Sequence, residues 1–338
     1  MPETTRAIVL ARRPGNGISE DDFKIVTRDL PEPADEQVLV RNVVLSVDPY
    51  MRLGMSDRMG TPAPQQVGEL MSGGAVGVVT RSRSQALPEG TMVSSMNGWR
   101  EAYVADASSV QPVASDGGRP SLYLGILGLT GITAYAGVER LLEPQAGETV
   151  FVSGAAGAVG SVVVQLAKRR GCKVLGTAGS AEKISWLRDT LGADAVANYK
   201  KDDLNDFLTQ NAPEGIDHYF DNVGGETLDA AILALKPRGR IVVCGAISQY
   251  NTDNYCAGPS EFFKISAKEL RLFGLNVSMW FPMAGEIIPQ LAQMLEAGEL
   301  VWEETAVEGL ENMPEAFVSL FRGANLGKMI VTLDGSKG

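Results

Sequence analysis

The sequence predicts an α/β protein in which a doubly wound parallel sheet is inserted into a β-rich domain. Three observations lead to this fold class. The chain has 338 residues, which is enough for two domains. Strand-like and helix-like segments alternate in the middle of the chain, and short strand-like runs occupy both ends. Alternation of this kind is typical of a parallel sheet covered by helices.

The N-terminal part, from Arg6 to about Val113, contains short apolar runs that Pro and Gly interrupt. The clearest runs are Arg6–Leu10, Gln37–Leu45 and Gly74–Val79. This pattern predicts a curved sheet or a small barrel. The segment 301–333 returns to short strands with one helix near 313–321, so we expect it to complete the first domain.

The middle part begins after the Gly-rich apolar stretch at 121–138 and a turn at Pro144–Gly147. Its predicted strands are Thr149–Ser153, Cys172–Thr177, Ala195–Ala197, Ile216–Asn222, Arg240–Gly245 and Leu270–Asn276. Its predicted helices are Ala158–Arg170, Ala181–Leu191 and Asp202–Thr209. This order predicts a parallel sheet with helices on both faces.

Composition and charge narrow the function. A net charge of −11 disfavours nucleic acids and anionic membrane surfaces as partners, so we expect a small-molecule ligand. The sequence shows neither an apolar run of membrane-spanning length nor a signal peptide at its start. Cys172, Cys244 and Cys256 are an odd set without paired spacing, which favours free thiols and a cytoplasmic location.

Metal chemistry is not expected. The sequence contains one histidine, His218, and no cysteine cluster. A zinc site needs three or four Cys, His or carboxylate ligands at suitable positions. We therefore expect catalysis without a metal.

The strongest local motif is the glycine-rich segment Val150–Ser161, where Gly154, Gly157 and Gly160 follow a strand and precede a helix. Glycines in this setting permit a tight turn and let backbone N–H groups approach a pyrophosphate. The helix N-terminus adds partial positive charge at the same place. The motif predicts a dinucleotide site, with close packing of helix on strand as the alternative role.

The next strand end favours NADP(H) over NAD(H). An NAD site usually places Asp or Glu there for the ribose diol, but this chain has Thr177–Ser180. If Ser180 caps the following helix, Lys183 lies in its first turn and can face a phosphate on the adenosine ribose. Glu182 opposes this assignment, and a solvated Lys183 is the alternative.

Six motifs in sequence order resemble the zinc-independent branch of the medium-chain dehydrogenase/reductase superfamily. They are Ser46–Arg52 (SVDPYMR), Ala155–Gly160 (AAGAVG), Gly179–Lys183 (GSAEK), Phe220–Gly225 (FDNVGG), Cys244–Tyr250 (CGAISQY) and Asn325–Lys328 (NLGK). The chain is most similar to the group of prostaglandin reductases, plant alkenal double-bond reductases and bacterial curcumin reductases.

This resemblance implies two domains and a dimer. A GroES-like β-barrel substrate domain comprises residues 1–122 and 300–338, and a Rossmann NADP(H)-binding domain comprises residues 123–299. Members of this group lead us to expect a homodimer, formed through the edge of the Rossmann sheet.

The resemblance also implies a cofactor-binding set. Gly157, Ala158, Val159 and Gly160 are expected to hold the pyrophosphate, and Lys183 and Tyr199 the 2′-phosphate. The remaining cofactor contacts are expected from Asn222, Cys244, Gly245, Ala246, Ile247, Ser248, Tyr250, Leu275, Asn276, Val277 and Asn325. Asn222 and Asn325 have turn formation as an alternative role, and Tyr199 that of a surface aromatic residue.

The implied chemistry is the reduction of an α,β-unsaturated aldehyde or ketone. NADPH supplies a hydride to the β-carbon, and the resulting enolate oxygen needs a hydrogen-bond donor. Tyr250 is the first catalytic candidate, acting directly or through the nicotinamide ribose, and Tyr50 is the second. The alternative is that both tyrosines only shape the site.

An apolar substrate wall is suggested by Met51, Trp280, Phe281 and Met283, whereas the spacing of Met55 and Met59 favours core positions. Two other functions stay open at this point. One is an NADPH-dependent quinone oxidoreductase, and the other is a non-catalytic NADP(H)-binding protein.

Overall fold

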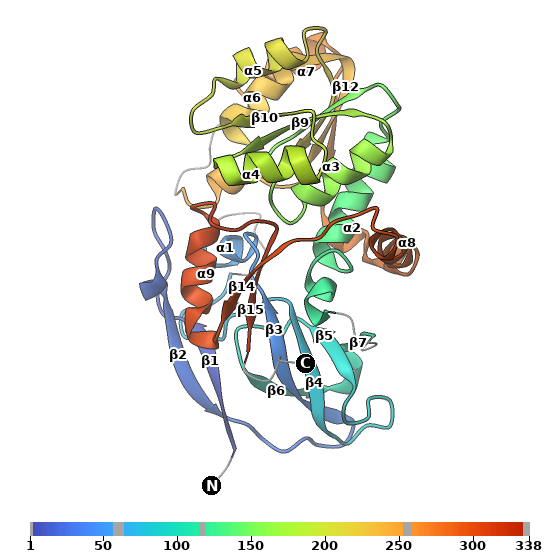
Figure 1. The fold of residues 1–338 in the computed structure, drawn as a ribbon. Helices are drawn as coiled ribbons and strands as arrows, with labels where there is room; N and C mark the ends of the chain where they lie inside the picture. Colours follow the sequence, from blue (N-terminus) through green and yellow to red (C-terminus); the bar gives the residue numbers. More distant parts are fainter. Residues whose placement is uncertain (1–2, 57–63, 115–118, 253–257, 334–338) are drawn as a thin grey trace. The chain divides into compact units, whose positions relative to one another are not determined.

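The computed structural model describes residues 3–56, 64–114, 119–252 and 258–333. The chain divides into two compact units (Figure 1). One comprises Met1–Gly125 with Glu304–Gly338, and the other comprises Ile126–Glu303. The sequence-based limits were 122/123 and 299/300, and the structure divides the chain at 125/126 and 303/304. Each unit is described by itself below.

The first unit is built mainly from β-strands. β1 (Thr4–Leu10) and β2 (Phe23–Asp29) form an antiparallel pair. A seven-stranded sheet has the order β14 (Glu304–Glu308), β15 (Lys328–Thr332), β3 (Gln37–Ser46), β4 (Ala75–Ser82), β5 (Met92–Ser95) and β7 (Gln111–Pro112), with β6 (Ala102–Asp106) paired to β3. Because β15 runs antiparallel to β3, the C-terminal segment completes the sheet of the N-terminal part.

Aromatic and methionine side chains fill the core of this unit. Phe23 stacks on Trp99 with ring centroids 5.1 Å apart, and Phe317 of α9 (Met313–Leu320) meets Trp99 edge-on at 5.5 Å. Met55 is fully buried, as its spacing predicts, and Met51 is only 5% exposed. The prediction that Met51 lines a substrate wall is wrong, because its sulfur accepts the Trp99 indole N–H at 3.4 Å inside this core. Met59 lies outside the described residues.

The second unit contains a six-stranded sheet in the order β10 (Ala195–Asn198), β9 (Lys173–Ala178), β8 (Thr149–Val152), β11 (Ile216–Asp221), β12 (Leu235–Val243) and β13 (Arg271–Gly274). All five pairings are parallel. This is the strand order of a Rossmann fold. The order in which successive strands are added to the sheet reverses between β8 and β11. β8 is buried along its whole length, as expected for a strand covered on both faces.

Helices cover both faces of this sheet (Figure 1). α2 (Leu129–Tyr135), α3 (Gly160–Arg169) and α8 (Ala284–Glu296) pack together in one layer, whereas α5 (Leu204–Asn211), α6 (Gly225–Ala234) and α7 (Phe262–Ala267) form a second group. π-helical segments at Ala136–Leu142 and Trp186–Thr190 extend α2 and α4 (Ala181–Ser185). The sequence patterns predicted α3, α4 and α5 within two residues at each start, and they missed α2, α6, α7 and α8.

The short remaining elements form turns and caps: α1 (Met51–Gly54) and 3-10 turns at Glu20–Asp22, Ala107–Ser109, Pro120–Leu124, Ile247–Gln249, Val277–Met279, Phe281–Met283 and Leu310–Asn312. Among the described residues, no helix has the length and apolar character needed to cross a membrane.

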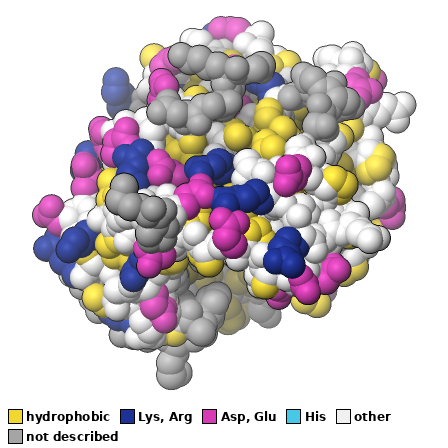
Figure 2. Space-filling view, turned by 90° about the horizontal axis from the view of Figure 1, so that it is seen from below, with side chains coloured by type: hydrophobic (Ala, Val, Ile, Leu, Met, Phe, Trp, Pro, Cys, Tyr) yellow, Lys and Arg dark blue, Asp and Glu magenta, His cyan; other side chains and the backbone are white. Residues whose placement is uncertain are grey.

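Charged side chains of both signs are mixed on the face shown in Figure 2. In the first unit, for example, Arg81 pairs with Glu3 and Glu32, and Arg83 pairs with Asp35 at 2.7 Å. Such interspersed pairs contribute little to stability individually.

Candidate cofactor and catalytic site

The glycine turn after β8 has a tightly constrained backbone. Gly154 has a φ of +57°, a conformation that glycine adopts without strain. A Cβ on Gly160 would lie 2.3 Å from the Gly154 carbonyl oxygen, so no other residue fits there. Gly157, Ala158 and Val159 connect these two glycines and lead into α3. The turn therefore presents backbone, without bulky side chains, at the N-terminus of a ten-residue helix, which suits a pyrophosphate.

The C-terminal end of β9 brings two predicted phosphate ligands to one corner. Ser180 caps α4 by accepting the Lys183 N–H at 3.3 Å, which places Lys183 in the first helical turn. The Tyr199 ring lies against the backbone of Gly179, because a Cβ on Gly179 would come within 2.8 Å of the Tyr199 hydroxyl. No carboxylate occupies the strand end from Thr177 to Ser180.

Positive charge accumulates at this corner. The Lys200 ammonium lies 5.8 Å from the centre of the Tyr199 ring. Burial, with a further contribution from Lys200, lowers the pKa of Lys183, while Glu182 acts in the opposite direction. A phosphate dianion would relieve the repulsion between these two lysines. The corner therefore fits a ribose 2′-phosphate and not a free ribose diol.

A buried hydrogen-bond network fixes the chain after β11. Asp221 is fully buried, and its Oδ1 accepts hydrogen bonds from the Tyr219 hydroxyl at 2.7 Å and the Gly224 N–H at 2.8 Å. Burial raises the pKa of Asp221, an effect that these hydrogen bonds oppose. Asn222 donates through Nδ2 to the Ser153 carbonyl at 2.8 Å, so its side chain links the ends of β8 and β11. Asp221 belongs to the motif Phe220–Gly225, but its anchoring role was not predicted.

The loop after β12 is anchored to the same network. The N–H groups of Cys244 and Gly245 both donate to the Asp221 carbonyl, at 2.9 and 3.1 Å. Ile247 donates to the Asn222 carbonyl at 3.3 Å, and Ser248 donates to Val223 at 2.6 Å. This loop thus holds a fixed position over the end of β11.

Tyr250 folds back onto that loop. Its hydroxyl oxygen accepts the Ala246 N–H at 3.2 Å, which leaves the hydroxyl proton available for donation. Burial raises the pKa of Tyr250, and the bond from Ala246 acts in the opposite direction. Tyr250 therefore stays protonated at neutral pH. Burial and Asp221 raise the pKa of the nearby Cys244 thiol to about 12, so this thiol is not a nucleophile at neutral pH.

The chain after β13 contributes the last predicted residues of the second unit. Leu275 is buried, and its N–H donates to the Val243 carbonyl at 2.9 Å. Asn276 accepts the Ser278 N–H at 3.1 Å and caps the turn that Val277 begins. Ligands bind at the carboxyl ends of the strands in folds of this kind, and every predicted residue of this unit lies at that edge of the sheet.

Tyr50 and Asn325 belong to the first unit. Tyr50 precedes α1 and is 36% exposed. Although part of the residue is exposed, desolvation of its hydroxyl and the nearby Asp48 carboxylate raise the pKa of Tyr50, so the phenol is neutral. Asn325 donates through Nδ2 to the Gly327 carbonyl at 2.7 Å in the turn before β15, a contact that fits its alternative role as a turn residue.

Comparisons with known proteins agree with these features. The family described as "N-terminal domain of oxidoreductase" matches residues 6–113, and the family described as "Zinc-binding dehydrogenase" matches residues 158–297. Putative NADP-dependent oxidoreductase YfmJ of Bacillus subtilis is 42% identical, with 98% of each chain covered. The chain belongs to the zinc-independent branch of the medium-chain dehydrogenase/reductase superfamily. It is therefore an oxidoreductase.

Two further comparisons place it within this superfamily. NADPH-dependent curcumin reductase of Escherichia coli is 34% identical, with 98% of each chain covered. The crystal structure of CurA from Vibrio vulnificus has a TM-score of 0.93 and 37% identity, covering 98% of this chain and all of that one. The predicted fold class, a Rossmann sheet with a separate β domain, is confirmed by this match.

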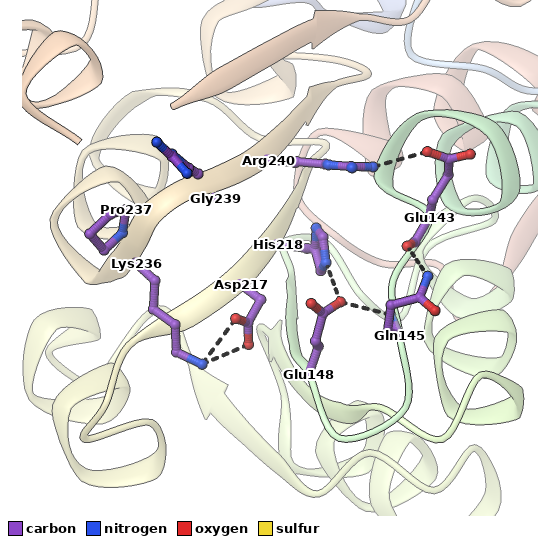
Figure 3. Close-up of a pocket in the computed structure, with 10 residues that line it drawn as sticks. Glu143, Gln145, Glu148, Asp217, His218, Lys236, Pro237, Gly239 and Arg240 are labelled. Carbon is purple, nitrogen blue, oxygen red and sulfur yellow. Dashed lines mark hydrogen bonds and ion pairs between the residues drawn. The ribbon is translucent and has the colours of Figure 1, made fainter. Parts of the chain in front are cut away.

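Medium-chain dehydrogenases that use zinc hold it with clustered ligands. In the described parts of this chain, no three His, Cys, Asp or Glu side chains are grouped to bind a metal. His218 instead pairs with Glu148 at 2.8 Å. These two residues line a hollow of about 440 Å³ at the amino ends of β8, β11 and β12 (Figure 3), on the sheet edge opposite the glycine turn.

Proposed function

We propose that this oxidoreductase uses NADPH to reduce the carbon–carbon double bond of α,β-unsaturated aldehydes and ketones. The observation that carries the cofactor choice is the corner formed by Lys183, Tyr199 and Gly179, where two lysines lie close together and the strand end from Thr177 to Ser180 has no carboxylate. The substrate class is supported by relatives that include 2-alkenal reductase (NADP(+)-dependent) of Nicotiana tabacum, 40% identical over 93% of this chain, and bovine prostaglandin reductase 1, 42% identical over 93%.

The cofactor is NADP(H). Its pyrophosphate would lie on the turn from Gly157 to Gly160, and its 2′-phosphate between Lys183 and Tyr199. Asn222, residues 244–248 with Tyr250, residues 275–277 and Asn325 would hold the rest. We assign these remaining contacts mainly to the backbone of the loop after β12. The side chains of Asn222 and Asn276 contribute less, because they already make local hydrogen bonds.

When bound, NADPH supplies the hydride. The chain itself must orient the substrate carbonyl and stabilise negative charge on its oxygen once the β-carbon has accepted that hydride. A single well-placed donor can contribute about 3 kcal/mol to this stabilisation. Tyr250 and Tyr50 are neutral phenols whose protons can be donated to that oxygen, and solvent can deliver the proton to the α-carbon.

Trp280 and Met283 are half-buried, and Phe281 is exposed. We assign these three side chains to the apolar wall of the substrate site. Such side chains adapt to irregular apolar ligands.

We also propose a homodimer and a cytoplasmic location. β13 is an edge strand of the parallel sheet, Leu272 on it is 40% exposed, and Met279 nearby in sequence is 76% exposed. An exposed apolar edge strand of this kind invites pairing with another chain, and twofold pairing of identical edges closes the assembly. Light scattering on the purified protein tests this, and Leu272→Lys should yield the monomer.

The test of the function is the oxidation of NADPH and NADH in the presence of a 2-alkenal, an aryl enone, a prostaglandin enone and a simple quinone. Consumption of NADPH with formation of the saturated carbonyl supports the proposal. Turnover of the quinone alone would make the chain a quinone oxidoreductase. Binding of NADPH without turnover of any of these would indicate a non-catalytic NADP(H)-binding protein.

A further inference from the structure

Two motifs that lie far apart in the sequence meet inside the first unit. Asp48 belongs to the motif Ser46–Arg52, and Lys328 ends the motif Asn325–Lys328. The Lys328 ammonium lies 3.0 Å from Asp48 Oδ1. Lys328 is 1% exposed and Asp48 is 7% exposed, so this is an ion pair within the protein interior.

The pair is fully hydrogen-bonded. Besides Asp48, the Lys328 ammonium donates to the carbonyl oxygens of Val47 at 2.8 Å and Met329 at 3.0 Å. Three acceptors match its three protons. The second carboxylate oxygen of Asp48 accepts the Ser46 hydroxyl. An arrangement this complete holds the chain at Val47 and Asp48 in one conformation.

Tyr50 follows directly in the same turn. The Asp48 carbonyl accepts the Met51 N–H at 3.2 Å, and the Tyr50 carbonyl accepts the Leu53 N–H at 3.0 Å. Asp48 therefore begins the turn that carries Tyr50 into α1. The Asp48 carboxylate also acts electrostatically on the Tyr50 phenol.

The charge of Asp48 poses a problem for the proposed chemistry. An unpaired buried carboxylate next to Tyr50 would repel the negative charge that develops on the substrate oxygen. The Lys328 ammonium removes this repulsion by neutralising Asp48. It also links the start of β15 to the chain that follows β3, and so fixes the backbone conformation of the turn that contains Tyr50.

We propose that Lys328 is a positioning residue for the reductase reaction, which neutralises Asp48 and fixes the turn that presents Tyr50. This inference rests on the proposed function, because it assumes that Tyr50 donates to the substrate. It assigns no contact between Lys328 and substrate or cofactor.

The test is a cycle of Lys328→Met, Asp48→Asn and the double variant. Lys328→Met leaves the Asp48 carboxylate without its ammonium partner, and kcat should fall about 10- to 100-fold, the range found when residues that orient metal ligands are removed. The KM for NADPH should change less than about twofold. The double variant removes both charges and should recover the part of kcat that was lost to the unpaired charge. Arg12→Met is the matched control, because it leaves the buried Asp22 in the same unit without its guanidinium partner.

A second readout does not depend on activity. With ring-labelled tyrosine, the carbon resonance of Tyr50 can be assigned by its absence in Tyr50→Phe. Lys328→Met should shift this resonance, the double variant should return it, and Arg12→Met should leave it in place. An unshifted resonance, or a kcat loss that the double variant does not relieve, would overturn the proposal.

The two proposals can fail separately. The cycle is measured on whichever substrate of the panel gives the highest rate, so a preference for quinones contradicts the enone assignment and leaves the test of Lys328 valid. Conversely, rapid enone reduction by Lys328→Met would overturn only the role of Lys328.

Discussion

In the parallel sheet of the second unit, the carboxyl edge, where the strands end, and the amino edge, where they begin, are lined by different chemical groups. At the carboxyl edge, the close approach of Gly160 to the Gly154 carbonyl, the packing of Tyr199 on Gly179 and a few buried hydrogen bonds shape the surface. At the amino edge, the hollow in Figure 3 is lined by polar and charged side chains, including the ion pair Lys236–Asp217 at 2.9 Å and the hydrogen-bonded pair His218–Glu148 at 2.8 Å. The carboxyl edge presents backbone N–H groups and lysines that suit an anionic ligand, whereas Lys236 and Asp217 at the amino edge neutralise one another.

The hollow at the amino edge, despite its polar lining, is therefore not the candidate active site. Ion pairs that satisfy each other leave little charge for a ligand. The glycine turn is less conspicuous, but its backbone N–H groups and the lysine corner have the charge and the access that a dinucleotide phosphate needs.

The largest effect is expected from Gly160→Val at the carboxyl edge. The added Cβ would collide with the Gly154 carbonyl at 2.3 Å, so the turn must open and the free energy of unfolding should fall by about 3 kcal/mol or more. NADPH binding, measured by calorimetry, should be lost. Gly285→Ala is the control, since no atom lies within 4 Å of that Cβ position. Unchanged binding by Gly160→Val would contradict the assignment of the pyrophosphate to this turn.

The next largest effect concerns the tyrosines. Removal of the Tyr250 or the Tyr50 hydroxyl by substitution with Phe should lower kcat for an enone, each by about 100-fold if that hydroxyl donates to the enolate oxygen. The loss of the Ala246–Tyr250 hydrogen bond should cost only about 1 kcal/mol of stability. Full enone turnover by the double variant Tyr50→Phe, Tyr250→Phe would refute a catalytic role for tyrosine. Steady-state kinetics with thermal melts separates the two effects.

A moderate effect is expected from Lys183→Ala, which should raise the KM for NADPH about tenfold or more and leave that for NADH nearly unchanged. Lys173→Ala is the matched control, because Lys173 begins β9 at the opposite edge of the sheet, whereas Lys183 follows the end of that strand. Equal losses with both cofactors would argue against a 2′-phosphate at this corner.

The same lysine gives a pH dependence. Its pKa in the free protein is lowered by burial and by Lys200, and a bound phosphate dianion favours the charged form and raises that pKa. Binding of NADPH therefore takes up a proton in the window between the two values. Affinity should weaken as pH rises through that window, and Lys183→Ala should abolish this part of the dependence. Calorimetry in buffers of different ionisation enthalpy measures the proton uptake.

The smallest effect is expected at the amino edge. His218→Gln interrupts the pair with Glu148, and the free energy of unfolding should fall by about 1 kcal/mol. Both kcat and the KM for NADPH should stay within about twofold of the unaltered chain, since His218 lies at the edge opposite the glycine turn. A large loss of NADPH affinity in this variant would contradict the division of roles between the two edges.

The parts of the molecule that depend on local backbone requirements could be predicted from the amino-acid sequence. The turn around Gly157 is predicted by three glycines between a strand and a helix, because larger side chains would collide there. Ser180 predicts a helix cap, which places Lys183 in the first turn of that helix. The alternation of strands and helices determined the parallel sheet. Each of these signals is contained within a few neighbouring residues.

The contacts between residues far apart in the sequence could be learned only from the tertiary structure. It placed Met51 in the aromatic core with Trp99, joined Asp48 to Lys328, and made Asp221 the anchor of the loop that carries Tyr250. The helices α6 and α8 were also not predicted, because the sequence patterns did not distinguish these segments from loops. Contacts of this kind depend on how strands pair and pack across long separations in the chain, and no local propensity or spacing encodes that pairing.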